Sequence, residues 1–135
     1  MGAGVLGPLV SVLSSKNQKA VVDAAASLEN ITIELPAEQN RALRAGALES
    51  ALRLMSHSGK DAAALRAAGA RAFRGLLMQN PPACRRAIEK GGLDVLMHML
   101  EKDEEESQAA ASAALAALAD ADSEILQKLG VERLV

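Results

Sequence analysis

The stretch AGALESALRLM, residues 45–55, decides how the rest of this sequence is interpreted. It begins with a small residue and a glycine and continues with apolar residues at helical spacing. The same arrangement returns three more times, led by Gly4, Gly91 and Gly130, and the last copy is truncated. The four glycines are 42, 45 and 39 residues apart. Such spacing indicates stacked repeats, because one unit of this size cannot bury its apolar stripe alone.

The segments between the glycines follow one order as well. A short polar stretch leads into a long alanine-rich helix, a proline interrupts the chain, and a short helix returns to the next glycine. We expect long helices at about 18–33, 61–79 and 104–119, and short helices at 37–45, 83–90 and 123–129. Asp61 suits the N-cap of the second long helix, and the acidic run 103–106 suits the positive end of the third. Each leading glycine is expected to end the short helix in a left-handed conformation.

Composition supports a helical chain. The 135 residues include 28 alanines and 20 leucines, but only eight valines and four isoleucines. Alanine and leucine favour helices, whereas β-branched and aromatic residues favour strands, so we expect an all-α fold. Phe73 is the one aromatic residue, which excludes an aromatic platform for single-stranded nucleic acid.

Charge and segment patterns narrow the class of protein further. The net charge is −2, from 15 basic and 17 acidic side chains, so no overall field selects nucleic acid or an anionic membrane. The sequence contains no run of 18 apolar residues, so no membrane insertion is expected. The single Cys84 cannot form an internal disulfide and fits a reducing compartment. We expect a cytoplasmic protein, and a nuclear location is left open.

The repeat resembles the armadillo family in its three-helix period, in the Ala-Gly-Ala-Leu opening and in the segment 27–31 (Ser-Leu-Glu-Asn-Ile). The resemblance covers nearly the whole chain and implies a right-handed superhelix, an armadillo-like α-solenoid of about three repeats. We expect one domain over 1–135, with units at 1–36, 37–80 and 81–122 and a partial unit at 123–135. HEAT repeats, which have two helices per unit, remain the alternative.

The resemblance also implies a function. Armadillo arrays bind extended peptides along a groove lined by their long helices, where an asparagine and a tryptophan four residues earlier contact the partner. Asn30 matches that asparagine in the first long helix, and the equivalent positions in the others are Gly75 and Ala117. The three tryptophan positions hold Ala26, Arg71 and Ala113, so five of the six expected groove residues are missing. Recognition of basic peptides by this ladder is therefore disfavoured. Asn30 either contacts a partner or satisfies local backbone.

A second candidate surface lies on the second long helix, which carries Arg66, Arg71 and Arg74 at helical spacing. If Arg71 lies in the groove, this face is basic and suits carboxylates of an acidic partner. The alternative is an ordinary solvated helix face. Gly75 either allows helices to approach closely, permits a bend, or gives access to a partner's backbone. The expected protein-binding residues are Asn30, Arg71, Arg74 and Gly75.

No pattern for chemistry accompanies this surface. His57 and His98 have no cysteine or acidic residue at metal-ligand spacing, and Cys84 has no evident base. We therefore expect a non-enzymatic protein-binding scaffold without metal or cofactor. The alternative is a structural piece of a longer solenoid that self-associates or stacks end to end. The apolar terminal segments 5–13 and 131–135 favour that alternative, because capped arrays present polar outer faces.

Overall fold

A computed structural model describes residues 2–59 and 62–121. That part of the chain forms eight α-helices and no strand, which agrees with the all-α prediction. The helices are α1 (Gly2–Val12), α2 (Gln18–Thr32), α3 (Pro36–Arg44), α4 (Ala47–Met55), α5 (Ala63–Leu77), α6 (Pro81–Glu89), α7 (Gly92–Lys102) and α8 (Glu105–Ala121).

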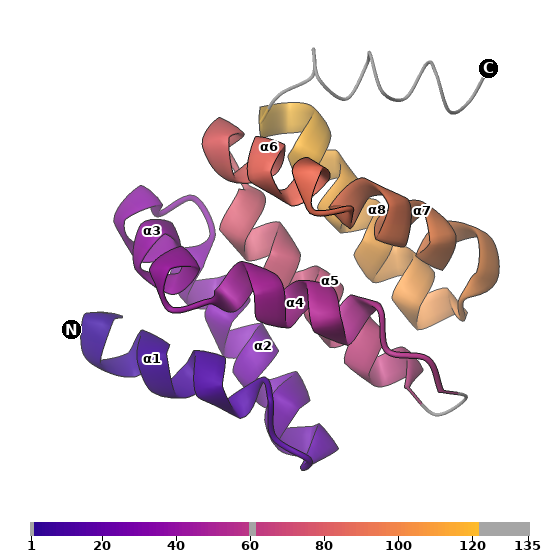
Figure 1. Cartoon of the computed structure of the whole chain (residues 1–135), viewed down its shortest axis with the longest axis horizontal. Coiled ribbons are helices and arrows are strands. Elements are labelled where there is room, and N and C mark those ends of the chain that lie inside the picture. The colour runs from indigo at the N-terminus through magenta and orange to yellow at the C-terminus, as the bar shows by residue number, and fades with distance from the viewer. Residues whose placement is uncertain (1, 60–61, 122–135) are drawn as a thin grey trace.

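The helices stack in two layers (Figure 1). The medium helices α1, α4 and α7 run side by side in one layer, and the long helices α2, α5 and α8 form the second layer behind them. The short helices α3 and α6 connect one unit to the next along an edge of the stack. The long and short helices begin and end within about two residues of the expected positions. The short helix expected at 123–129 lies outside the described residues.

Glycine and proline set the boundaries between these helices. Gly46 and Gly91 have φ of +92° and +90°, so the expected left-handed conformation is confirmed at both. Pro36 and Pro81 stand in the first turns of α3 and α6, where a missing N–H costs nothing. The same expectation is wrong for Gly4, which lies inside α1 because no helix precedes it in the described chain. Gly130 and Asp61 lie outside the described residues.

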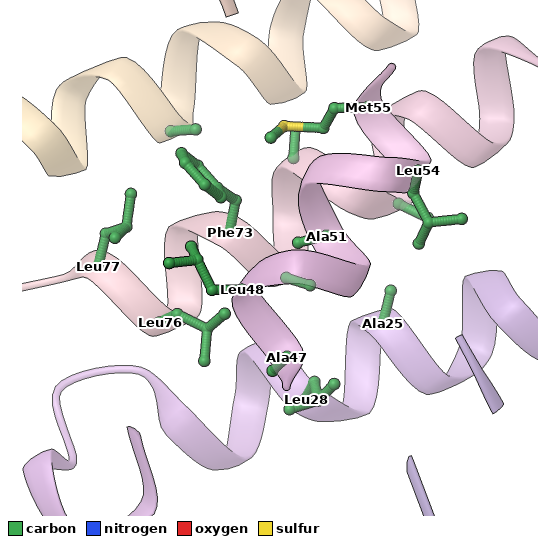
Figure 2. Close-up of a cluster of buried hydrophobic side chains, with 14 of the residues drawn as sticks. Ala25, Leu28, Ala47, Leu48, Ala51, Leu54, Met55, Phe73, Leu76 and Leu77 are labelled. Atoms are coloured by element: carbon green, nitrogen blue, oxygen red, sulfur yellow. The ribbon is translucent and has the colours of Figure 1, made fainter. Parts of the chain in front are cut away.

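One continuous core runs between the two layers. Phe73 is the largest buried side chain and is completely shielded from solvent. Figure 2 shows it in a cluster of leucines and alanines from α2, α4 and α5, with its ring pointing away from α2. Small alanines such as Ala25, Ala47 and Ala51 alternate with Leu28 and Leu48 across this contact. Helix axes can therefore approach closely while the larger side chains fill the space between them.

Two glycines in α5 mark the closest helix contacts. A Cβ atom added at Gly69 would lie 2.8 Å from the Ala51 carbonyl oxygen in α4. A Cβ atom added at Gly75 would lie 2.6 Å from Thr32 Oγ1 and 2.8 Å from Glu29 Cα in α2. The missing side chains therefore permit close helix approach, one of the roles considered for glycine in this helix.

Candidate functional site

The three long helices share one register. Their first turns open with the same bond, from Val21 N to the Asn17 oxygen, from Arg66 N to the Ala62 oxygen and from Gln108 N to the Glu104 oxygen. A position in α2 therefore corresponds to the residue 45 later in α5, and that residue corresponds to the one 42 later in α8. In this register, Asn30, Gly75 and Ala117 are equivalent, as are Ala26, Arg71 and Ala113.

The outward side of α2, α5 and α8 forms the candidate surface, which we call the long-helix face. Its members are exposed or half-buried, and they include Lys19, Asp23, Ala26, Asn30, Ala64, Arg71, Arg74, Glu106, Ala109, Ala113 and Ala116. Most of the side chains on α8 are alanines, so the part of the face that α8 forms has few polar or projecting groups. The polar groups are concentrated on α2 and α5.

Asn30 lies near the end of α2 and is exposed. Its side chain forms no hydrogen bond with any residue that the structure describes. An amide carries two donors and an acceptor, so Asn30 presents all three to solvent. Satisfaction of local backbone is therefore not seen among the described residues, and contact with a partner stays a prediction.

Arg71 and Arg74 both project from α5, but to different neighbours. Arg74 Nη1 lies 3.0 Å from Glu29 Oε2 in α2, and the Glu29 side chain is only 18% exposed. Arg71 Nη2 lies 3.6 Å from Glu106 Oε1 in α8, where both side chains are well exposed, at 38% and 56%. The Arg74 pair is close and shielded, whereas the Arg71 pair is loose and screened by water. Exchanging the present ion pair for a partner's carboxylate would therefore cost less free energy at Arg71 than at Arg74.

Gly75 does not reach the long-helix face. It is buried where α5 contacts α2, and its carbonyl oxygen accepts a 3.0 Å hydrogen bond from Gln39 Nε2. Gln39 itself is buried in α3; it also donates to the Met78 oxygen and accepts from Asn80. The structure thus gives Gly75 a packing role between repeats. The sequence did not identify Gln39 as a buried hydrogen-bonding residue. The one indication it offers is a polar residue three positions before Ala42, on the buried side of the same short helix.

Arg66 lies apart from the other two arginines. Its guanidinium binds both carboxylate oxygens of Asp103 and also donates to the His57 and Gly59 carbonyls. The hydrogen bond from Arg66 holds the pKa of the Asp103 carboxyl below its usual range, against the opposing effect of burial. The expectation that Arg66 shares a basic face with Arg74 is therefore wrong. Arg66 instead joins the α4–α5 loop to the end of α7.

The described side chains that could act as nucleophiles or metal ligands are not grouped into a site. Cys84 is buried, and its sulfur lies 3.4 Å from the Leu77 oxygen. Within the described ranges, no three His, Cys, Asp or Glu side chains are grouped to hold a metal ion. Over the same ranges, no helix combines the length and the apolar character needed to cross a membrane.

No protein-family model matches the sequence, and no curated protein matches it. Solved structures do. An engineered protein aligns with 94% of this chain at 25% identity and a TM-score of 0.78. Computationally designed armadillo repeat proteins for modular peptide recognition align with 84% of it, at 25% identity and a TM-score of 0.71. The chain has an armadillo-like repeat fold.

A third similar structure is a designed armadillo repeat protein in complex with the peptide (KR)4. It is 24% identical over 85% of this chain, with a TM-score of 0.71. The armadillo-like chain spans 52%, 47% and 47% of the lengths of these three structures.

Proposed function

We propose that this armadillo-like array is a non-enzymatic protein-binding module whose long-helix face binds an extended segment of a partner. The observation that carries the proposal is the free amide of Asn30 beside the arginines of α5 on that face. An exposed amide suits the backbone of an extended peptide, and a loosely paired arginine suits a carboxylate. The similarity to arrays designed for modular peptide recognition supports the same use.

We further propose that the partner segment is acidic. The positions where the family places tryptophan hold Ala26, Arg71 and Ala113, so the face offers a cation where basic peptides would need aromatic side chains. A partner carboxylate at Arg71 would replace Glu106, whose pair is 3.6 Å long and exposed. Arg74 would keep its ion pair with Glu29 and so connect α5 to α2 beneath the bound segment. Gly75 would contribute by holding α2 and α5 close together.

The test is selection of binders from a randomised peptide library, followed by affinity measurements with variants. We expect selected peptides to be rich in Asp and Glu, and we expect Arg71→Glu to weaken their binding at least about tenfold. Asn30→Ala should weaken it by a smaller factor. Arg44→Glu, at an exposed position of α3, changes net charge equally and serves as the matched control. Equal affinities for wild type, Arg71→Glu and Asn30→Ala would refute binding at this face.

A second candidate function is end-to-end stacking, and one observation favours it. Val5 in α1, the first of the described helices, is 47% exposed and could pack against another copy of the chain. The segment 131–135 lies outside the described residues. Light scattering over a range of concentrations would test stacking, with Val5→Asp as the variant that should abolish it. A wild-type protein that stays monomeric at every concentration would eliminate this candidate.

A further inference from the structure

Two clefts open on the opposite edge of the stack from the short helices, where each medium helix meets the loop to its long helix. The first, of about 560 Å³, is lined by Ser14, Ser15, Lys16, Gln18, Arg53 and His57, with leucines at its base. The second, of about 480 Å³, lies one repeat further along and is lined by His57, Arg66, Asp94, His98, Lys102 and Asp103 among others. They are equivalent, because Leu13 and Ser14 in one correspond to Met55 and Ser56 in the other.

The two clefts differ in charge. Two carboxylates line the second cleft, and one of them, Asp103, accepts both hydrogen bonds that Arg66 can direct to it. The first cleft is lined by Lys16, Arg53 and His57, and no carboxylate among the described residues lines it. In the second cleft, the carboxylate of Asp103 therefore already balances the charge of Arg66. The first presents Lys16 and Arg53 together with uncharged polar groups and leucines.

Arg53 shows how far this imbalance extends. Its Nη2 atom donates to Ser14 Oγ at 2.9 Å and to Ser50 Oγ at 3.2 Å. The described residues give it these neutral acceptors and no carboxylate. Neutral hydroxyls accept hydrogen bonds from a guanidinium but do not balance its charge, whereas a carboxylate would do both. A carboxylate entering the cleft would thus meet an arginine already oriented toward it.

The neighbouring helix end adds to the positive potential. Asn17 caps α2, whose first turn begins at Gln18 on the wall of the cleft. That turn contains no acidic residue, so the positive end of the helix dipole is not compensated within the helix. Lys19 is already paired with Asp23, but Lys16 has no ion pair with the described residues. The N-terminus of α2, Lys16 and Arg53 therefore all make the potential in the first cleft more positive.

We propose that this first cleft is a second binding site, separate from the long-helix face, and that it takes a carboxylate side chain from an acidic segment of a partner protein. Arg53 and Lys16 bind the carboxylate, the serine hydroxyls donate to its remaining oxygen lone pairs, and the leucines at the base contact the partner's aliphatic stem. Charge complementarity selects this occupant. The proposal does not depend on binding at the long-helix face.

The test uses a fluorescently labelled polyglutamate peptide and measures its binding by anisotropy. We expect saturable binding that weakens as salt is added, and we expect Lys16→Gln/Arg53→Gln to raise Kd about tenfold or more. Arg44→Gln/Lys90→Gln removes the same charge from exposed positions away from the cleft and should change Kd less than about twofold. All variants carry Arg71→Gln, which removes the cation proposed to bind carboxylates on the long-helix face, so that Kd reports the cleft alone. If Arg53→Gln lowers the helical content, Lys16→Gln alone replaces the double variant, with Arg44→Gln as its control.

Several results would overturn the proposal. They are absence of saturable binding in the Arg71→Gln background and equal weakening by both double variants. Saturable binding that occurs only while Arg71 is intact would place the peptide on the long-helix face. Displacement of the peptide by inorganic phosphate as readily as by unlabelled polyglutamate would show a general anion site instead. Lys16- and Arg53-dependent sedimentation with phosphatidylserine vesicles, without polyglutamate binding, would identify a membrane contact in its place.

Discussion

Replacing Gly75 by alanine tests whether the contact between α2 and α5 holds the repeats together. The new Cβ would lie 2.8 Å from Glu29 Cα and 2.6 Å from Thr32 Oγ1, whereas ordinary contact begins at 3.4 Å. Neither neighbour can turn away, because the first is backbone and the second donates a 2.6 Å hydrogen bond to the Leu28 oxygen. Helix α2 must therefore move away from α5 along its C-terminal half.

Two opposing effects set the magnitude. Overpacking at a rigid helix contact costs about 3 kcal/mol, and alanine is better than glycine inside a helix by about 1 kcal/mol. We expect Gly75→Ala to lower the free energy of unfolding by about 2 kcal/mol, and to lower Tm by about 8 °C for a chain of this size. Thermal unfolding followed by circular dichroism would measure both. The long-helix face should also weaken as a peptide-binding surface, because its spacing changes.

Gly4 supplies the matched control. It lies inside α1, and nothing lies within 4 Å of a Cβ atom built there. Gly4→Ala should therefore gain about 0.5–1 kcal/mol, since helix propensity acts without a clash. If both substitutions stabilise the protein to the same extent, the close approach of α2 and α5 is not a determinant of its stability.

Two further predictions concern polar contacts between repeats. Asp103→Asn should cost about 1–3 kcal/mol at neutral pH, because Arg66 loses its carboxylate partner. The pKa of Asp103 is lowered in the folded state, so its contribution to the free energy of unfolding is present above the unfolded pKa and is lost as pH falls through the folded pKa. Urea unfolding should therefore show the unfolding free energies of the wild type and Asp103→Asn converging below about pH 4. Gln39→Met keeps the buried volume but leaves the Gly75 and Met78 carbonyls without their donor, and should cost about 2–4 kcal/mol. Asn40→Ala, at the next and exposed position, should change the unfolding free energy by less than about 0.5 kcal/mol.

The helices could be predicted from sequence because their boundaries depend on local chemistry. Gly46 and Gly91 occupy a conformation that other residues avoid, and Pro36 and Pro81 suit only a first helical turn. The turns after α2 and α5 gave no such signal. Their left-handed residues are Glu34 and Gln79, with φ of 58° and 54°, and neither residue type favours that conformation.

The candidate site was predictable only in part. Repeat register assigned Asn30 to the asparagine position and Arg71 to the tryptophan position of the expected groove, because period and helix length follow from the pattern of residues. Ion pairs between repeats were not predictable, since Arg66 and Asp103 are 37 residues apart and meet only through the packing of α5 against α7 and α8. Burial of Gln39 depends equally on tertiary contact. Sequence pattern locates a residue on a helix face, but the neighbouring helix decides its partner.

Among the described residues, the long-range side-chain hydrogen bonds join residues 36 to 45 apart. Those of Gln39 lie within the unit 37–80, and each of the others connects one unit only to the next. The array therefore behaves as a one-dimensional chain of coupled units, in which stability is the sum of unit and interface contributions. Helix α5 belongs to both interfaces, through Glu29 and Arg74 on one side and Ala63 and Ser107 on the other. Helix α4 belongs to both as well, because Arg53 donates to Ser14 and Glu49 accepts from Arg86. Mechanical load or a partner acting at one end would reach the other through the middle unit, by way of these two helices.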